Sequence, residues 1–410
     1  MKENKAYLQK LTQESPFHLR HAIERLREGL FDPIAVRLLT AHEDKLDAVV
    51  ERCFQKLEIG EQAHLCVCGS YGQGKSHSLT YIQQKALEAN YVTSMVNLDL
   101  REVPLHDFRQ IYRALLANIQ FPEKDVSFAA QWKDWTQQEM HNRNDLPNGV
   151  VDLLPANIPH LFRSILVGIA QKNVSLSARQ KKAKKYANFR PREFSYLLER
   201  ALGGDVIPVN KLRNALKYRQ VSFYREGSLA SKGIDIYLQM ISGLTKLFQQ
   251  FGYRGWVLLF DEGESIAQVR ISSRSRSYQI LHRLFFQEEL GKLFPVFAFT
   301  DDFFQCVQNE NYERTYFRKE EEIPYFPINY SEAWEDLNVY RLEDLSKKEW
   351  EGLIEKLAHL YASAYQQRSS PEAIFPQMMA QIVQLQGEET RYQLKALINQ
   401  LDVIYQEQIL

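Results

Sequence analysis

The sequence predicts an α/β protein: a mostly parallel sheet covered by helices on both faces, with a helical insertion and a C-terminal helical lid. Three observations support this prediction. Apolar runs of strand length alternate along the chain with stretches of helical spacing. Most of these runs are unbroken, as expected for strands that are buried on both faces. One run leads into a glycine-rich loop, and a helical pattern follows that loop directly.

The glycine-rich loop, residues 69–76, fits the P-loop pattern G-x-x-x-x-G-K-[ST] at every fixed position. The apolar run 63–68 predicts a buried strand before it, and 76–88 predicts a helix after it. The N–H groups of such a loop and the positive end of the helix dipole bind phosphate oxygens. The stretch therefore favours a P-loop NTPase fold over an ordinary glycine-rich turn. The candidate nucleotide contacts are Gly69, Ser70, Tyr71, Gly72, Gln73, Gly74, Lys75, Ser76 and His77. Among these, His77 is better explained by packing than by catalysis.

Two motifs hold the residue types that a bound ATP would need. Lys75 would reach the β- and γ-phosphates, and the Ser76 hydroxyl would bind Mg²⁺. The apolar run 256–260 ends in Asp261 and Glu262, which is the Walker B pattern. Asp261 would hold Mg²⁺ opposite Ser76, and Glu262 would orient and polarise the attacking water. A charged strand end is the alternative explanation, but the P-loop upstream favours Walker B.

Further polar groups are candidates for sensing the γ-phosphate. Thr300 ends the predicted strand 295–300 and would hold the attacking water, although a hydroxyl that caps the strand explains it nearly as well. Arg391 opens the last predicted helix and would reach the γ-phosphate. Arg314 and Arg318 follow the sensor strand and are candidate arginine fingers that act in trans in an oligomer. For each arginine, a surface salt bridge stays the open alternative.

The charge balance sets limits on nucleic-acid binding. Lys plus Arg and Asp plus Glu both number 51, so no overall field draws the chain to DNA. Local basic clusters remain candidates for contacts with DNA phosphates. A solvated helix face explains these clusters at least as well, because aromatic residues for base stacking are sparse near them. The candidate DNA contacts are Lys181, Lys182, Lys184, Lys185, Arg274 and Arg276.

The pattern divides the chain into three predicted regions. They are a helical N-terminal segment, 1–60, a P-loop ATPase core, 61–330, and a helical lid, 335–410. A mostly helical insertion is expected in the core at about 122–220, and its first part, 122–154, is polar and expected to be irregular.

Two local expectations concern the N-terminal segment. Residues 31–39, with Pro33 among them, are expected to be extended or irregular. Thr40 is expected to cap a new helix, with Glu43 completing a capping box.

Cellular location and cysteine use follow from shorter features. No apolar run is long enough to cross a bilayer, and residues 1–10 lack the apolar core of a signal peptide, so we expect a cytoplasmic protein. Cys66 and Cys68 alternate on one predicted strand and therefore share a face. Core packing explains them better than metal binding, because no second ligand pair stands at zinc spacing.

Taken together, these motifs resemble the AAA+/STAND-like branch of P-loop ATPases. More closely, the chain resembles the ATP-binding proteins of BREX-type bacterial anti-phage systems, the BrxD-like family. The resemblance covers nearly the whole chain, including the helical insertion, and it is carried by residues 21–29, 69–77, 252–264, 274–281, 299–304 and 387–391. The chain departs from the AAA+ pattern in one respect. That pattern has an arginine finger after the sensor strand, and the sequence does not decide between Arg314 and Arg318 for this role, which leaves activation in trans open.

The resemblance implies an ATPase that acts with other proteins of a defence system, with DNA and a homo-oligomer as further candidate partners. From the motifs we expect ATP and Mg²⁺ as cofactors and slow hydrolysis that drives a switch or motor. GTP is less favoured because no N-K-x-D stretch follows the sensor strand. Two alternatives remain: a nucleotide-bound scaffold that does not hydrolyse, and a DNA-binding loader or regulator.

Overall fold

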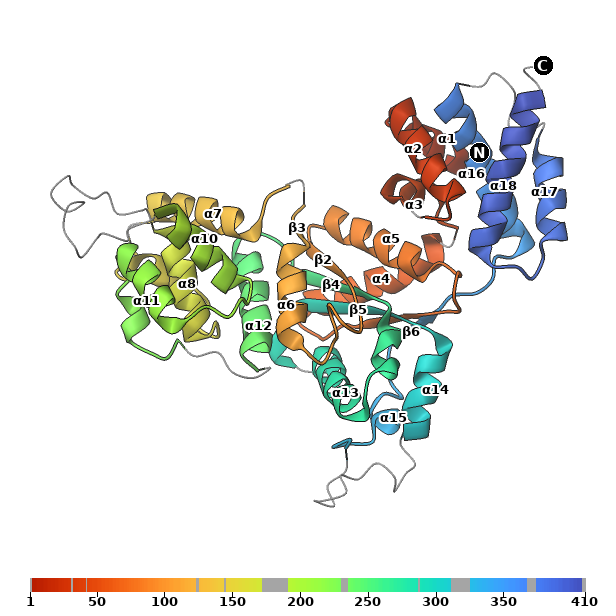
Figure 1. Ribbon diagram of the computed structural model, residues 1–410. Helices are drawn as coiled ribbons and strands as arrows, with labels where there is room; N and C mark the ends of the chain where they lie inside the picture. Colours follow the sequence, from red (N-terminus) through yellow and green to blue (C-terminus); the bar gives the residue numbers. More distant parts are fainter. Residues whose placement is uncertain are drawn as a thin grey trace.

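The computed structural model describes residues 2–30, 32–41, 43–122, 125–143, 145–171, 191–229, 235–286, 288–310, 325–366 and 374–407. At its centre lies one six-stranded sheet with the order β3-β2-β4-β5-β1-β6 (Figure 1). Neighbouring strands are parallel except β2 and β3, which are antiparallel. The strands are β1 (Leu65–Cys68), β2 (Val92–Asn97), β3 (Ile119–Gln120), β4 (Trp256–Asp261), β5 (Leu293–Phe299) and β6 (Val339–Arg341). The predicted α/β class and mostly parallel sheet are confirmed.

The parallel register brings the ends of the three central strands to one edge. Cys68 of β1 pairs with Phe299 of β5, and Phe260 of β4 pairs with Phe297 of β5. β5 lies between β1 and β4, so the loops that follow these two strands flank it. In open α/β sheets, ligands bind at this carboxyl edge.

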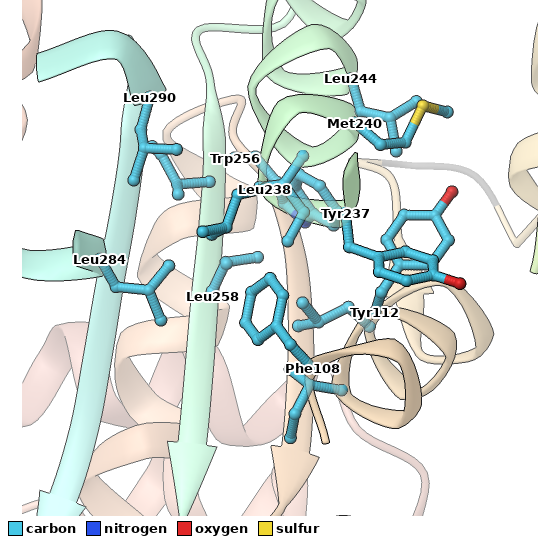
Figure 2. Close-up of a cluster of buried hydrophobic side chains, with 14 of the residues drawn as sticks. Phe108, Tyr112, Tyr237, Leu238, Met240, Leu244, Trp256, Leu258, Leu284 and Leu290 are labelled. Carbon is cyan, nitrogen blue, oxygen red and sulfur yellow. The ribbon is translucent and has the colours of Figure 1, made fainter. Parts of the chain in front are cut away.

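Two hydrophobic layers cover the sheet, and strand residues alternate between them as the pleat requires. On one face, Val67 and Leu259 pack with α4 (Glu43–Glu58) and α5 (Lys75–Glu88). The other face carries Cys66 and Cys68, which share it as predicted and are buried, free cysteines. Helices α6 (Phe108–Ala117), α12 (Asp235–Gln250) and α13 (Ile271–Phe286) cover that second face. Figure 2 shows how large side chains of α6 and α12 fill the space above β4.

The helical insertion extends the second layer away from the sheet (Figure 1). It comprises α7 (Phe128–Asn142), η1 (Gly149–Leu153), α8 (His160–Ala170), α10 (Pro191–Leu202) and α11 (Val209–Tyr218). The expectation of an irregular stretch at 122–154 is wrong over α7. This polar helix is held by Trp132, which is fully buried and donates a 2.8 Å hydrogen bond from Nε1 to the carbonyl of Leu166.

The two ends of the chain form a single helical bundle beside the sheet (Figure 1). Residues of both ends, such as Ile23, Ile354 and Leu397, share its hydrophobic core. Arg27 forms an ion pair with Asp402 at 2.9 Å across the two ends. The helices are α1 (Lys2–Thr12), α2 (Pro16–Arg27) and α3 (Pro33–Leu39) from one end and α16 (Lys347–Tyr365), α17 (Phe375–Gln384) and α18 (Thr390–Glu407) from the other.

The structure corrects the two local expectations about the N-terminal segment. Residues 33–39 form helix α3, because Asp32 caps its first N–H groups and Pro33 sits at the first helical position, where proline is favourable. Thr40 does not cap the next helix; it ends α3, and its hydroxyl donates a 2.7 Å hydrogen bond to the carbonyl of Val36. Among the described residues, no helix combines the length and apolar character that crossing a membrane requires.

Candidate functional site

A pocket opens at the carboxyl edge of the sheet, between the glycine loop and the helical bundle. Four groups of residues line it. The loop and the start of α5 contribute residues 71–78, and the turn after β4 contributes Asp261, Glu262 and Glu264. The N-terminal end of the chain contributes residues such as Leu39 and Thr40. The C-terminal part of the chain, from β6 onward, contributes residues such as Leu342, Leu345, Thr390, Arg391 and Leu394.

Backbone conformation explains the glycines of the loop. Gly72 and Gly74 have φ angles of 80° and 99°, in the left-handed region that glycine adopts without strain. A Cβ atom at Gly72 would lie 2.5 Å from Oε2 of Glu389, so a larger residue would close the cradle against the lid. Gly74 precedes α5 and offers no side chain to cap it, which leaves the first N–H groups of the helix for a ligand.

Lys75 is 8% exposed and is the buried cation of the pocket. Its Nζ donates to the carbonyls of Gly69 at 3.1 Å and Ser70 at 3.2 Å. Oε1 of Glu264 lies 3.7 Å from the same nitrogen. A buried ammonium group is costly without such partners. The loop is therefore folded around a fixed positive charge at its centre.

Gln73 ties the loop to the chain beyond β6. Its Oε1 accepts a 2.6 Å hydrogen bond from the N–H of Ser70, which closes the loop on itself. Its Nε2 donates at 2.8 Å to Asp344. Gln73 thus has a structural role inside the predicted motif, at a position where the motif itself accepts any residue.

The acidic side of the pocket depends on a tight turn after β4. Glu262 has φ 56° and ψ 38°, a left-handed conformation that costs energy for a residue with a side chain. Its N–H donates a 2.9 Å hydrogen bond to Oδ1 of Asp261. A Cβ at Gly263 would lie 2.5 Å from the carbonyl of Ala298 on β5, so the turn lies directly against the neighbouring strand. The strained turn brings three carboxylates to one pocket.

The electrostatics of Glu262 follow from this crowding. Burial raises the pKa of its carboxyl group, and the negative charges of Glu264 and Asp261 raise it further. Lys75 and Arg391 act in the opposite direction. The net effect is a raised pKa for Glu262, so this carboxylate is a better proton acceptor than an exposed glutamate.

Glu264 is a carboxylate of the pocket that neither the P-loop pattern nor the Walker B pattern includes. Besides its contact with Lys75, it has a buried Oε2 without a hydrogen-bond partner among the described residues. An unpaired, buried carboxylate oxygen is costly, which indicates a functional constraint. The sequence signal was present as a second glutamate two residues after Glu262, but the Walker B pattern does not include that position.

The other predicted residues are placed differently. Arg391, near the start of α18, lines the pocket, and its guanidinium group lies 5.5 Å from the ring centre of Tyr71. Thr300 follows β5 and its carbonyl accepts from the N–H of Phe303 at the start of α14 (Asp301–Glu310), outside the pocket lining. Ser76 and Asp261, the predicted metal ligands, line the same pocket.

Among the candidate DNA contacts, Arg274 is engaged inside the fold. It forms a buried ion pair with Glu310 and donates 2.9 Å hydrogen bonds to the carbonyls of Ala267 and Val269. It therefore braces the segment after the acidic turn. Arg276 is exposed. Lys181, Lys182, Lys184, Lys185, Arg314 and Arg318 lie outside the described residues.

The protein is therefore an α/β protein with a pocket at the carboxyl edge of its sheet. Loop glycines, one buried lysine and three carboxylates line this pocket, an arrangement that is compatible with a P-loop fold. The family model of the BREX system ATP-binding protein BrxC/D matches residues 15–143 and 233–410. The chain therefore belongs to this family of ATP-binding proteins of BREX phage defence, which confirms the resemblance seen in its motifs. Residues 144–232, which include α8, α10 and α11, lie outside the match, so the match does not reach most of the helical insertion to which the resemblance was expected to extend. No curated protein matches the chain.

Proposed function

We propose that the chain binds ATP with Mg²⁺ in this pocket and hydrolyses it, slowly without a partner, as an AAA+-like switch or motor of a BREX complex. The observation that carries the proposal is the meeting of buried Lys75 with Asp261, Glu262 and Glu264 around a pocket that the glycine loop borders. A fixed cation beside several carboxylates suits a ligand that is itself anionic and arrives with a divalent metal.

The loop residues fit a triphosphate. Gly72 and Gly74 leave room for backbone N–H groups to approach phosphate oxygens, and Lys75 supplies a charge that is already desolvated. Ser76 and Asp261 would hold the metal from two sides. Bound Mg²⁺ would neutralise charge on the phosphates during hydrolysis.

Glu262 is the proposed general base. It lines the pocket from the strained turn, and its raised pKa matches it better to accepting a proton from water near neutral pH. Glu264 has two proposed tasks: it balances the charge of Lys75, and it keeps the pKa of Glu262 raised. Thr300, outside the pocket lining, stays a predicted sensor that would act only after a rearrangement.

The apolar part of the pocket is proposed to take the base. Leucine side chains from α2, the turn after it, α3, the segment after β6 and α18 line it: Leu26, Leu30, Leu39, Leu342, Leu345 and Leu394. A flat ring is buried well among apolar side chains, with few polar contacts needed to orient it. This lining requires the N-terminal and C-terminal ends of the chain together.

Arg391 is proposed to report the γ-phosphate to the lid. Its guanidinium group now lies over Tyr71, an exposed ring of the loop, in a contact that is worth about 1 kcal/mol at a solvent-exposed position. A γ-phosphate would offer a stronger, charge-assisted partner. If Arg391 left the Tyr71 ring for the γ-phosphate, the lid would close on bound ATP. It would not close on ADP, which lacks that phosphate.

Partners and location extend the proposal. BREX membership implies other proteins of the defence system as partners. Three further points stay predictions: a homo-oligomer with Arg314 or Arg318 as the arginine finger, contacts with DNA through Lys181 to Lys185 and Arg276, and a cytoplasmic location. So do the region boundaries 1–60, 61–330 and 335–410. The alternatives are a scaffold that binds ATP without hydrolysis and a DNA loader.

Phosphate release by Glu262→Gln tests the proposal. We expect ATP affinity close to that of wild type, because a glutamine fills the same space, and release at least about 100-fold slower, because an amide is not a base. Glu88→Gln, an exposed carboxylate at the other end of α5, serves as the control and should behave as wild type. Equal turnover in Glu262→Gln and wild type would reject Glu262 as the base. ATP binding with no measurable turnover in wild type, with or without partners, would favour the scaffold.

A further inference from the structure

His77 faces the end of helix α3 from the first turn of α5. Its Nε2 lies 2.8 Å from Oγ1 of Thr40, and that hydroxyl donates its proton to the carbonyl of Val36 at 2.7 Å. Because a hydroxyl has only one proton to give, Nε2 of His77 must be the donor to Thr40. The proton of that hydrogen bond is therefore carried by Nε2 of the His77 ring.

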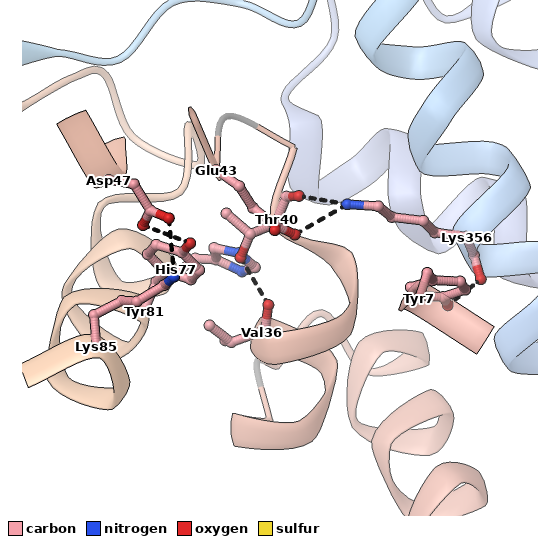
Figure 3. A network of polar contacts seen from close by, with 9 residues as sticks. All are labelled: Tyr7, Val36, Thr40, Glu43, Asp47, His77, Tyr81, Lys85 and Lys356. Carbon is pink, nitrogen blue, oxygen red and sulfur yellow. Dashed lines mark hydrogen bonds and ion pairs between the residues drawn. The ribbon is translucent and has the colours of Figure 1, made fainter. Parts of the chain in front are cut away.

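The main chain of Thr40 makes a second connection, to the lid. Nζ of Lys356, on α16, donates to the carbonyl of Thr40 at 3.1 Å and to Oε1 of Glu43 at 3.0 Å. The carbonyl of Lys356 in turn accepts a 2.6 Å hydrogen bond from the hydroxyl of Tyr7 on α1. Figure 3 shows Thr40 between His77 and Lys356, with the lid helix on the far side. Thr40 therefore joins the loop helix to the core of the bundle.

A separate contact runs along the same face of α5. The hydroxyl of Tyr81 donates to Asp47 at 2.8 Å, and Nζ of Lys85 donates to the same carboxylate at 2.9 Å (Figure 3). His77, Tyr81 and Lys85 follow one another at intervals of four residues and so share this face. The Asp47 contacts hold α4 to α5 and do not involve Thr40, although α4 also contacts α16 through Glu43 and Lys356. They offer a matched internal control.

Thr40 and His77 also line the pocket, as does Leu353 on α16. A ligand at the loop would therefore contact both residues of the first hydrogen bond, or lie beside them. The nucleotide and the lid would thus act on the same residue from opposite sides.

We infer that His77, Thr40 and Lys356 form a relay that couples nucleotide occupancy of the loop to the position of α16. The inference rests on the proposed ATP binding and adds a path from that site to the bundle. His77 acts as a positioning residue: it fixes Thr40, and Thr40 fixes Lys356. Sites that share a hydrogen-bonded partner are energetically coupled, whereas separate sites act independently.

A double-variant cycle on ATP affinity tests the relay. His77→Leu and Lys356→Met each remove one donor to Thr40, and we expect each to weaken ATP binding about three- to tenfold. The double variant should bind no more weakly than the weaker single variant, because either change already breaks the relay. In the control cycle, the effects of Tyr81→Phe and Lys356→Met should multiply.

Hydrogen exchange of α16 provides a second measurement. In wild type, ATP should slow amide exchange in α16. Thr40→Val has the shape of threonine without the hydroxyl, so it should fold and, at an ATP concentration that saturates it, lose this response, whereas Thr40→Ser should retain it. The relay is overturned if the effects of His77→Leu and Lys356→Met multiply in the double variant. It is also overturned if α16 in Thr40→Val responds to ATP as in wild type. Failure of the proposed function would look different, because wild type itself would then not bind ATP.

Discussion

The polar and apolar halves of the pocket are built in contrasting ways. The polar half comes mainly from two short stretches, 71–78 and 261–264, which lie at or just beyond the end of a central strand, with Arg391 added by the lid. The apolar half comes from Leu26, Leu39 and Leu394, which are far apart in the sequence and meet in one bundle. Phosphate chemistry therefore depends on local backbone geometry. Base binding depends on the association of the two chain ends, so it is the half that a partner or the lid can change.

Lys75→Ala gives the largest expected effect and removes the polar half. We expect ATP affinity to fall by at least about 100-fold, because the loop loses the ammonium group that is held at the carbonyls of Gly69 and Ser70. Binding of inorganic tripolyphosphate, measured by calorimetry, should fall in parallel. Adenosine, which has no phosphate, should bind the variant and wild type alike; a large loss of adenosine binding would mean that the two halves are not separable.

Gly263→Ala tests whether the acidic turn needs its close approach to β5. A Cβ would lie 2.5 Å from the carbonyl of Ala298, so we expect the free energy of unfolding to fall by about 1–3 kcal/mol and phosphate release to drop. Urea denaturation and a phosphate assay measure the two effects. Gly352→Ala on α16 is the matched control, since a Cβ there meets no atom within 4 Å and should be neutral or slightly stabilising. Equal behaviour of the two variants would contradict the tight turn.

Leu394→Asn sharpens the comparison from the apolar side. Placing an amide in the leucine-lined half should weaken binding of ATP, ADP and adenosine alike, by about tenfold, since one apolar contact is lost and a polar group is buried. Tripolyphosphate competes for the polar half only and should bind unchanged. Loss of tripolyphosphate binding in this variant would show that Leu394 supports the loop and not the base.

Glu264→Gln gives the smallest effect, a shift in the pH profile of hydrolysis. The carboxylate of Glu264 is one cause of the raised pKa of Glu262. Glu262 must be deprotonated to accept a proton, so activity falls as pH drops through its pKa. Removing the charge of Glu264 lowers that pKa, and the acid limb of the profile should move to lower pH. A shift to higher pH would contradict the assigned interaction between the two glutamates.

The polar half was predictable because each of its motifs is a run of consecutive residues. The glycine loop with Lys75 follows one apolar run, and the acidic pair Asp261–Glu262 follows another. A buried strand is the best explanation of both runs. Strands β1, β4 and β5 lie within the predicted runs or within two residues of them. Strands β3 and β6 were missed, since runs of two and three residues at the sheet edges carry no measurable alternation.

The apolar half was not predictable, because its determinants act over long distances. No local pattern says that α2 and α18 share a core, and Pro33 by itself predicts an extended or irregular stretch at 31–39. The same proline, after Asp32, occupies the first turn of α3. A proline at this point therefore fits either an irregular segment or the start of a helix. Glu43, three residues after Thr40, predicts a helix cap at Thr40, whereas the structure turns the Thr40 hydroxyl to Val36 and His77. Tertiary contacts decided these positions.

A structure of the protein with a non-hydrolysable ATP analogue and Mg²⁺ tests the central claim most directly. The account predicts one cation bonded to the hydroxyl of Ser76 and held by Asp261, with the triphosphate in the glycine loop and the base among the leucines. A triphosphate bound elsewhere, or a cation that neither Ser76 nor Asp261 holds, would contradict it.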